Sequence, residues 1–278
     1  MNYYIGTAGF SYRDWEGIFY PKTINKLNYY SSIFNFVEIN STFYSIPEKH
    51  FFESIRSRIK MDFKIAIKAN QIFTHQQDFP VNELENFYDL LELISPNLIC
   101  VLFQFPYSFH NNLENLKKIE LIKKLSYNHN ENNINIAIEV RHKTFLNENF
   151  IKFCKDNDLI FVNIDQPQIS YNLTLTSFST NKKYSYFRFH GRKEEKWFSE
   201  NTRSYERYDY LYNEKEINNL KEIIEENESE NIIISFNNHY KAKAIINALE
   251  LMEKLNLKPK ISSIQIKKSL VKFDQNLI

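Results

Sequence analysis

The sequence predicts a TIM-type (β/α)8 barrel, an α/β fold in which a closed, parallel, eight-stranded sheet is surrounded by helices. The 278-residue chain repeats one unit: a short β-rich run, polar residues, a loop and an amphipathic stretch. Strands that alternate with helices indicate a parallel sheet, and eight units in about 250 residues is the size at which such a sheet closes. An open doubly wound sheet usually carries a glycine-rich phosphate loop after a strand, and the sequence contains no such motif.

The predicted elements divide the chain into one domain and a tail. We expect strands at Tyr3–Thr7, Asn35–Asn40, Phe63–Asn70, Leu98–Phe105, Ile134–Arg141, Leu159–Asp165, Ser185–His190 and Asn231–Asn237. We expect helices at Asn82–Ile94, Leu113–Leu125, Asn147–Asp156, Asn213–Glu225 and Tyr240–Leu255. Asn82 with Glu85, and Asn213 with Glu216, have the spacing of an N-cap followed three residues later by Glu. Residues 1–257 would form the barrel, and residues 258–278 a C-terminal extension packed on it or partly flexible.

Alternation within the strands predicts which side chains point into the barrel. In the fifth strand one face carries only Ile and Val, and the other carries Ala137, Glu139 and Arg141. The apolar face suits the helical shell, and small residues below charged ones suit a crowded interior that opens at one end. The same reasoning places inward the pairs Lys68 and Asn70, Asn163 and Asp165, and Arg188 and His190.

The inward polar residues gather at the C-terminal ends of the strands. We expect a polar ring of Glu38, Asn40, Lys68, Asn70, Gln104, Glu139, Arg141, Asn163, Asp165, Arg188, His190 and Asn237, with His75 and His142 just beyond strand ends. Barrel enzymes place their chemistry at this end. The alternative is an ion-pair network that only closes the top of the barrel, because buried charges are costly unless they are paired.

Each residue of the ring has a chemical interpretation. Glu139, Asp165 and His190 are the candidate catalytic acids and bases, since neighbouring charges would separate their pKa values. Lys68, Arg141 and Arg188 form a cationic wall suited to a phosphate, a carboxylate or a developing oxyanion. The full substrate-binding set that we predict is Glu38, Asn40, Lys68, His75, Gln104, Arg141, His142, Arg188 and Asn237. For His142, packing at the surface is the favoured alternative to catalysis.

No cofactor and no metal is predicted, with a divalent metal as the alternative. Glu38, Glu139, Asp165 and His190 are metal-ligand types, and some barrels collect such residues from separate strands. Three nearby cations argue against a tightly bound divalent ion. The two cysteines have neither metal-type nor redox-type spacing.

Composition limits the partners. The net charge is +1 and 43% of the residues are hydrophobic, as in an ordinary globular protein. Nucleic acid is therefore a possible partner that charge does not favour. The sequence shows no signal peptide and no apolar run of 18 residues, so we expect a cytoplasmic protein without a membrane partner.

Two long loops lie next to the predicted mouth. The first covers residues 9–21, and the loop after the seventh strand carries Lys193, Lys196, Trp197, Arg203, Arg207 and Tyr208. Such aromatic and cationic residues suit stacking on a sugar or base, or closure as a lid. The equally supported alternative is that both loops plug the top of the barrel.

Motifs along nearly the whole chain resemble one known family. They are Ile5–Tyr12 with Trp15 and Phe19–Pro21, Val37–Tyr44, Lys68–Asn70 with Thr74 and His75, Leu102–Pro106, Glu139–His142, Arg188–Gly191, Arg207–Tyr212 and Phe236–Asn238. In this order they resemble the YecE-like family, also called domain of unknown function 72. The resemblance implies a TIM barrel and implies no settled activity.

From these features we expect an enzyme that acts by acid/base chemistry, as a hydrolase or isomerase, on a small polar, anionic substrate of sugar-like or nucleotide-like character. One alternative is a nucleic-acid-binding or nuclease-like barrel that grips a strand with its loops. The other is a barrel that binds a ligand without turnover, and fold alone does not rank the three.

Overall fold

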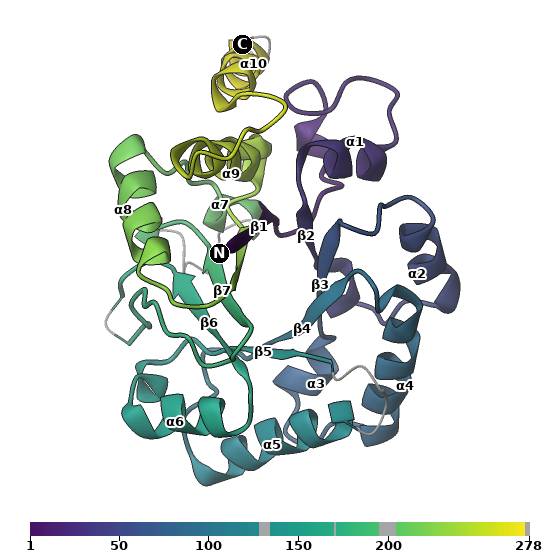
Figure 1. Cartoon of the computed structure of the whole chain (residues 1–278), viewed down its shortest axis with the longest axis vertical. Helices are drawn as coiled ribbons and strands as arrows, with labels where there is room; N and C mark the ends of the chain where they lie inside the picture. Colours follow the sequence, from purple (N-terminus) through teal and green to yellow (C-terminus); the bar gives the residue numbers. More distant parts are fainter. Residues whose placement is uncertain (128–133, 170, 195–203, 276–278) are drawn as a thin grey trace.

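The computed structural model is a (β/α)8 barrel, which confirms the predicted fold class. The structure describes residues 1–127, 134–169, 171–194 and 204–275. Eight strands pair in parallel in the order β1-β8-β7-β6-β5-β4-β3-β2 (Figure 1). They are β1 Asn2–Thr7, β2 Phe36–Ile39, β3 Lys64–Lys68, β4 Leu98–Gln104, β5 Ile136–Glu139, β6 Ile160–Asp165, β7 Tyr184–Phe189 and β8 Asn231–Phe236.

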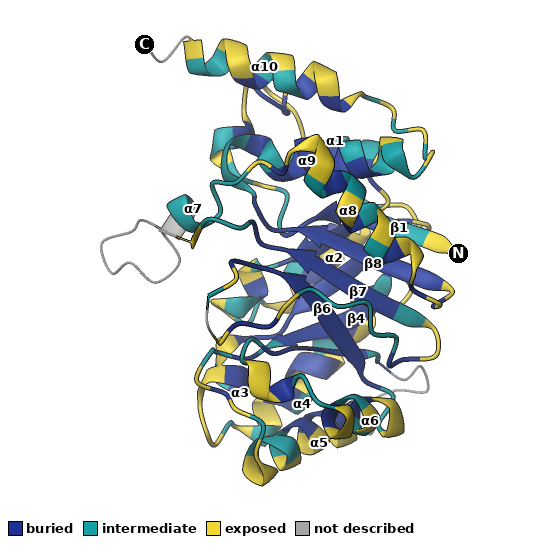
Figure 2. Ribbon diagram, turned by 90° about the vertical axis from the view of Figure 1, so that its left-hand side faces the viewer, coloured by how far each residue is buried: buried dark blue, intermediate teal, exposed yellow. Residues whose placement is uncertain are grey.

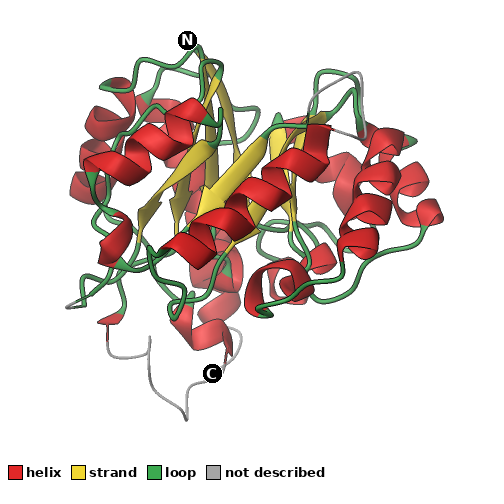
Figure 3. Cartoon of the chain, turned by 90° about the horizontal axis from the view of Figure 1, so that it is seen from below, coloured by secondary structure: helices red, strands yellow, loops and turns green. Residues whose placement is uncertain are grey.

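Helices surround the sheet, and Figure 3 shows them outside the strands. They are α1 Lys26–Ile33, α2 Lys49–Arg56, α3 Gln71–His75, α4 Val81–Leu91, α5 Leu113–Tyr127, α6 Glu148–Asp156, α7 Ser204–Arg207, α8 Glu214–Glu225, α9 Lys243–Lys254 and α10 Ser263–Gln275. Short 3-10 turns are η1 Arg13–Trp15, η2 Ser41–Phe43, η3 Glu92–Ile94, η4 Lys143–Phe145 and η6 Tyr240–Ala242. Within the described residues, no helix is both long enough and apolar enough to cross a membrane.

One of the two predicted helix caps is present. Asn213 caps α8, and Glu216 bonds back to the backbone of Asn213 to complete a capping box. The prediction for Asn82 was wrong. Helix α4 begins at Val81, so Asn82 lies inside its first turn and Pro80 occupies the N-cap position. Proline suits a helix start, where its missing N–H has no helical partner in any case.

A tyrosine from α1 completes the seam between β1 and β2. The hydroxyl of Tyr30 accepts from the backbone N–H of Thr7 at 2.8 Å and lies 3.2 Å from the carbonyl oxygen of Phe36, to which it donates. Further up, the N–H of Gly9 donates to the carbonyl of Glu38 at 2.7 Å. A Cβ at Gly6 would collide with the backbone oxygen of Phe36, so the close approach of the two strands requires glycine there. The barrel therefore closes through the Tyr30 hydroxyl, the backbone hydrogen bond between Gly9 and Glu38, and the close approach that Gly6 permits.

The repeat breaks between β6 and β7, where residues 166–169 and 171–183 contain no helix. An irregular segment covers the outside of β6 instead, and its backbone needs polar partners. Asn163 supplies them: its amide donates to the carbonyl of Phe178 at 3.0 Å, and its oxygen accepts from the N–H of Phe178 at 2.9 Å. The prediction that Asn163 and Asp165 point inward was therefore wrong. Val162 and Ile164 pair with Tyr186 and Arg188 and share their inward face.

The first long loop is packed into the body of the protein. Trp15 is fully buried, and its indole N–H donates to the carbonyl of His239 at 2.7 Å. Ile18, Phe19 and Tyr20 are buried as well. This packing favours the plug interpretation for this loop. Lys196, Trp197 and Arg203 of the other loop lie outside the described residues.

Helix α10 lies against α9 on the outside of the barrel (Figure 2). Ser263 at its start donates to Glu253 of α9 at 2.7 Å, and Asp274 near its end accepts from Lys241 at 2.6 Å. In Figure 2 the strands are buried along most of their length, whereas most helices expose one face. The hydrophobic core thus lies in and around the sheet. The C-terminal ends of the strands differ from it, because buried polar and charged residues gather there.

Candidate functional site

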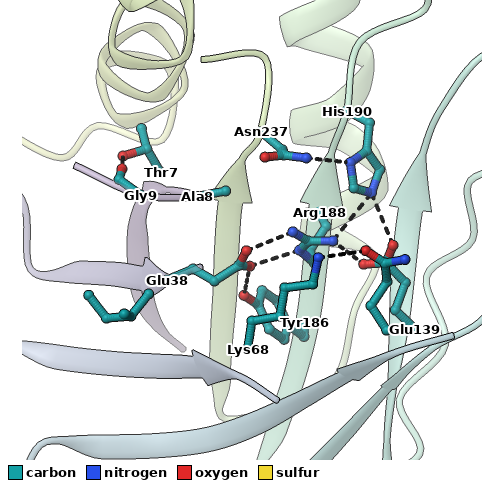
Figure 4. Close-up of polar contacts among 12 residues, drawn as sticks. Thr7, Ala8, Gly9, Glu38, Lys68, Glu139, Tyr186, Arg188, His190 and Asn237 are labelled. Atoms are coloured by element: carbon teal, nitrogen blue, oxygen red, sulfur yellow. Dashed lines mark hydrogen bonds and ion pairs between the residues drawn. The ribbon is translucent and has the colours of Figure 1, made fainter. Parts of the chain in front are cut away.

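Arg188 lies at the centre of the barrel mouth, between two glutamates from opposite sides of the sheet (Figure 4). Its Nε and Nη2 atoms donate to Glu38 of β2 at 2.7 and 2.6 Å. Its Nη1 atom donates to Glu139 of β5. Tyr186, two residues earlier on β7, donates its hydroxyl hydrogen to Glu38. All four side chains are buried, so an ion-paired layer spans the barrel.

Glu139 joins this layer to a second group above it. Arg141 donates from Nε and Nη2 to Glu139 Oε1 at 3.1 and 2.6 Å. His190 Nε2 lies 3.4 Å from the same oxygen, and Asn237 Nδ2 lies 2.9 Å from His190 Nδ1 (Figure 4). Arg141 Nη2 also lies 3.3 Å from His190 Nε2, so the imidazole contacts Arg141, Glu139 and Asn237 at once.

The charges in this network are fixed at neutral pH. Burial would raise the pKa of Glu139, but Arg188 and Arg141 hold it well below its usual range. Glu38 is likewise buried, and Arg188 keeps its pKa below the ordinary value. Burial, followed by the charge of Arg141, lowers the pKa of His190 to about 3. Both glutamates are thus ionised and the imidazole is neutral.

Lys68 differs from the other cations of the ring. Its Nζ donates to Gln104 Oε1 at 2.7 Å and lies 3.8 Å from the centroid of the Phe43 ring. Among the described residues no carboxylate lies within ion-pair distance of it. The residue as a whole is only 9% exposed. Burial, with the repulsion of Arg188, lowers the pKa of Lys68 to about 7, so the amine titrates at physiological pH.

The remaining ring residues form a rim around Lys68. Arg141 keeps 14% of its side chain exposed. His75 is exposed, and its ring lies 5.4 Å from that of Phe43. Asn40 Oδ1 is buried and accepts no hydrogen bond from the described part of the chain. The structure therefore brings Glu38, Lys68, His75, Gln104, Glu139, Arg141, Arg188, His190 and Asn237 together, and Asn40 follows directly after β2.

Two predicted site residues lie elsewhere. The Asp165 carboxylate faces outward, where it accepts from Arg192 Nε at 2.9 Å and from the Tyr212 hydroxyl at 2.6 Å. Pairing of Asp165 with Phe189 puts it on the outward face of the sheet, so its predicted place in the ring was wrong. His142 accepts from the N–H of Thr144 and thereby caps η4.

His142 belongs to an aromatic cluster outside the ring. Its ring lies 5.3 Å from that of Tyr107, 4.2 Å from that of His110 and 6.0 Å from that of Tyr171. Asn70 has a structural task as well, because its side chain caps α3 and donates to the carbonyl of Thr42.

Two contributors to the site were missed as functional residues. Tyr186 shares the inward parity of Arg188, and that parity was the signal for its contact with Glu38. Phe43 carries no polar signal at all. Its position over Lys68 follows from the 3-10 turn η2 after β2, which local sequence does not reveal.

Few side chains at the site are available as ligands for a metal ion. Both glutamates already accept from arginines, and Asp165 lies on the other side of the sheet. Within the described ranges, no three His, Cys, Asp or Glu side chains form a metal-binding group. These residues therefore do not fit a divalent cation at the mouth.

A hollow of about 580 Å³ lies beside the ring. It shares His75 with the ring and continues along α5, with Phe79, Asn115, Lys117 and Lys118 among the lining residues. The chemistry described above lies in the barrel mouth, so we place the candidate site there and treat the hollow as adjacent space.

Comparison with known proteins agrees with this architecture. The UPF0759 protein YunF of Bacillus subtilis is 30% identical over 275 residues, which cover 91% of this chain and 95% of that protein. A crystal structure of a DUF72 family protein from Thermotoga maritima has a TM-score of 0.82 and 32% identity over 92% of this chain and 100% of that one. Another, from Enterococcus faecalis, has a TM-score of 0.79 and 27% identity over 92% and 96%. Because residues 4–269 also match the family described as "Protein of unknown function DUF72", this chain belongs to that family.

Proposed function

We propose that this protein is an enzyme that binds a polar, anionic, sugar-like or nucleotide-like molecule at the barrel mouth and acts on it by acid/base chemistry. One observation carries the proposal: the ring holds Lys68, Arg141 and Arg188 against only two carboxylates, Glu38 and Glu139. With His190 neutral, protonated Lys68 leaves one positive charge in excess in a buried place. An anionic substrate would neutralise it.

Burial and neighbouring charges favour Lys68 for the proton transfers that the sequence assigned to Glu139, Asp165 and His190. Glu139 is held as a carboxylate, His190 is held neutral, and both are fully buried. Asp165 faces away. Lys68 has a pKa of about 7, and a general base works best when its pKa lies near the working pH.

The rim supplies binding groups around this amine. Arg141 is partly exposed, so it can reach a phosphate or carboxylate while it holds Glu139. The buried Oδ1 of Asn40 suits a substrate hydroxyl as its hydrogen-bond donor. The layer of Glu38, Arg188 and Glu139 fixes this arrangement from below. Among the reaction classes, isomerisation by proton transfer fits a lone neutral amine best.

Calorimetric titration with ribose 5-phosphate tests the binding part. We expect wild-type protein to bind at pH 7, and Arg141→Met and Lys68→Met to weaken binding by about tenfold or more, as loss of a charge-assisted contact does. Lys152→Met is the matched control, because Lys152 pairs with Asp156 at an exposed site on α6. Equal affinity in all four proteins would overturn the proposed anion site.

Catalysis is tested by incubating the protein with mixed sugar phosphates and nucleotides in deuterated water. We expect at least one compound to gain deuterium or change mass with wild type and not with Lys68→Met. Binding without any such change would identify a non-catalytic ligand-binding barrel. Tight, salt-dependent binding of single-stranded DNA in place of small anions would favour the nucleic-acid alternative.

A further inference from the structure

We propose that Lys68 is a covalent nucleophile whose Nζ forms a Schiff base with the carbonyl carbon of an anionic aldehyde or ketone, such as an open-chain sugar phosphate. This inference rests on the proposed function and adds to it both a substrate class and a reaction step. It starts from the surroundings of one amine, which no carboxylate of the described residues neutralises.

The position of Lys68 suits a nucleophile. The side chain leaves the last residue of β3 on the inward face, in register with Leu102 of β4. The ring face of Phe43 lies on one side of Nζ and the amide oxygen of Gln104 on another. The carbon chain is thereby held in place, while the amine keeps a hydrogen-bond partner that does not take its lone pair.

Charges on the surrounding elements act on this amine. Arg188 on β7, Arg141 after β5 and His75 on α3 face it, and so do the carboxylates Glu38 on β2 and Glu139 on β5. Each carboxylate already bonds an arginine, so neither holds Lys68 in its charged form through a direct contact. A desolvated lysine next to other cations is the arrangement that activates an amine for attack on a carbonyl.

The chemical step balances without any further reagent. The Lys68 ammonium first releases one proton to solvent, and the unprotonated Nζ attacks the carbonyl carbon to form a C–N bond. The attacking nitrogen then passes one of its own protons to the carbonyl oxygen, which gives a neutral carbinolamine. The hydroxyl group takes up a proton from solvent, equal to the one released at the start, and leaves as water as the C–O bond breaks, which gives a protonated imine. In sum, one carbonyl compound and the Lys68 ammonium give one protonated imine of Lys68 and one water molecule. The imine carries the same positive charge as the ammonium, so the phosphate of the substrate neutralises it equally well.

The chain contains a matched control lysine. Lys118 on α5 is also partly buried, its Nζ lies 5.5 Å from the centroid of the Phe79 ring, and burial lowers its pKa as well. Its amine donates to the carbonyl of Gln76 and lies in the adjacent hollow, away from the ring. Burial and an aromatic neighbour are therefore common to both lysines, and only Lys68 lies in the cationic mouth.

Reductive trapping tests the inference on the full-length protein. Wild type is incubated with glycolaldehyde phosphate and cyanoborohydride at pH 7, and peptide mass spectrometry measures the labelling of every lysine. Because the pKa of Lys68 is about 7, a substantial fraction of its amine is unprotonated at this pH, and the cationic mouth binds the phosphate of the probe next to it. We therefore expect Lys68 to be labelled at least about tenfold more than Lys118, which lies outside that mouth. Labelling of Lys68 that is no greater than that of Lys118 would overturn the inference.

Two further measurements separate this inference from the proposed function. Calorimetric titration with inorganic phosphate reports anion binding directly, and Lys118→Arg, which removes the control amine outside the ring, should bind phosphate within about threefold of wild type and still give the adduct at position 68. Phosphate binding by wild type without any Lys68 adduct would end the covalent role and leave the proposed function standing. Absence of both phosphate binding and labelling would end both. Selective labelling by uncharged glycolaldehyde with no phosphate binding would keep the nucleophile and overturn the anionic substrate.

Discussion

Arg188 and Glu38 form a two-pronged ion pair across the barrel interior, from β7 to β2, with N–O distances of 2.7 and 2.6 Å. The two residues are 150 positions apart in the chain, and both side chains are fully buried. Glu139 accepts a hydrogen bond from Nη1 of the same guanidinium, so Arg188 serves two carboxylates at once. This pairing explains how two ionised glutamates are accommodated inside the sheet.

Removal of the central guanidinium should destabilise the fold strongly. Arg188→Met would leave Glu38 and part of Glu139 buried without their counter-ion, which typically costs about 3–5 kcal/mol. Urea unfolding followed by circular dichroism measures the change. As control, Asp156→Asn removes an exposed i,i+4 pair with Lys152 and should cost no more than about 0.5 kcal/mol. Similar values for both variants would contradict the buried network.

Lys68 should make stability rise with pH above neutrality. Its pKa is about 7 in the folded protein and near the ordinary 10.5 when unfolded, so between these values the unfolded chain binds more protons. Stability then rises with pH across that window, by up to about 1.4 kcal/mol per pH unit from this group. Lys68→Met should remove this slope. Chemical unfolding of both proteins at pH 7, 8 and 9 gives the difference, and parallel profiles would show an ordinary lysine pKa.

The seam between β1 and β2 should depend on Gly6. Gly6→Ala would drive a Cβ into the backbone oxygen of Phe36, so the strands must separate, and overpacking of this kind costs about 1–3 kcal/mol. A thermal scan measures the loss, and Gly17→Ala is a comparison in which the added Cβ meets no clash. A Cβ at Gly17 would meet only ordinary van der Waals contacts, but its φ is +81°, so its substitution tests backbone strain alone. An unchanged melting temperature in Gly6→Ala would show that the strands approach less closely.

Tyr30 should be needed at the same seam through its hydroxyl group. Tyr30→Phe would leave the buried N–H of Thr7 without its acceptor, an expected loss of about 1–3 kcal/mol. The neighbouring Tyr29→Phe is the matched control, since no hydrogen bond of the Tyr29 hydroxyl occurs within the described chain. Denaturant midpoints report both variants, and equal stabilities would show that the hydroxyl bridge contributes nothing.

Substitutions at Asp165 and at Arg141 should have different effects: the first should lower stability, and the second should weaken ligand binding. Asp165→Asn weakens the contacts with Arg192 and Tyr212 on the outer face, so it should lower stability and leave ribose 5-phosphate affinity unchanged. Arg141→Met should weaken that affinity, by about tenfold or more if a charge-assisted contact is lost. Calorimetry at a temperature where both variants are folded makes the comparison. A loss of affinity in Asp165→Asn would return this carboxylate to the site.

The alternation of polar and apolar residues predicted the side-chain directions correctly on strands whose outer face is covered by helices. On β5 and β7 the apolar residues face helices, so the inward placement of Glu139, Arg188 and His190 followed correctly. On β6 the same alternation was assigned to the wrong face. Asn163 is polar because an irregular segment, and not a helix, covers this part of the strand, and Asp165 is polar because it accepts hydrogen bonds from Arg192 and Tyr212, which follow β7.

The sequence by itself determined the barrel, its strand order along the chain and the collection of charged residues at one end, because periodicity and strand-end chemistry are local properties. The tertiary structure alone decided which charges meet. Arg188 binds Glu38 and Glu139 across the interior, and Lys68 is left with Phe43 and Gln104. Its pKa of about 7 follows from burial and from cations on distant strands, and distances between such strands are set only when the sheet closes.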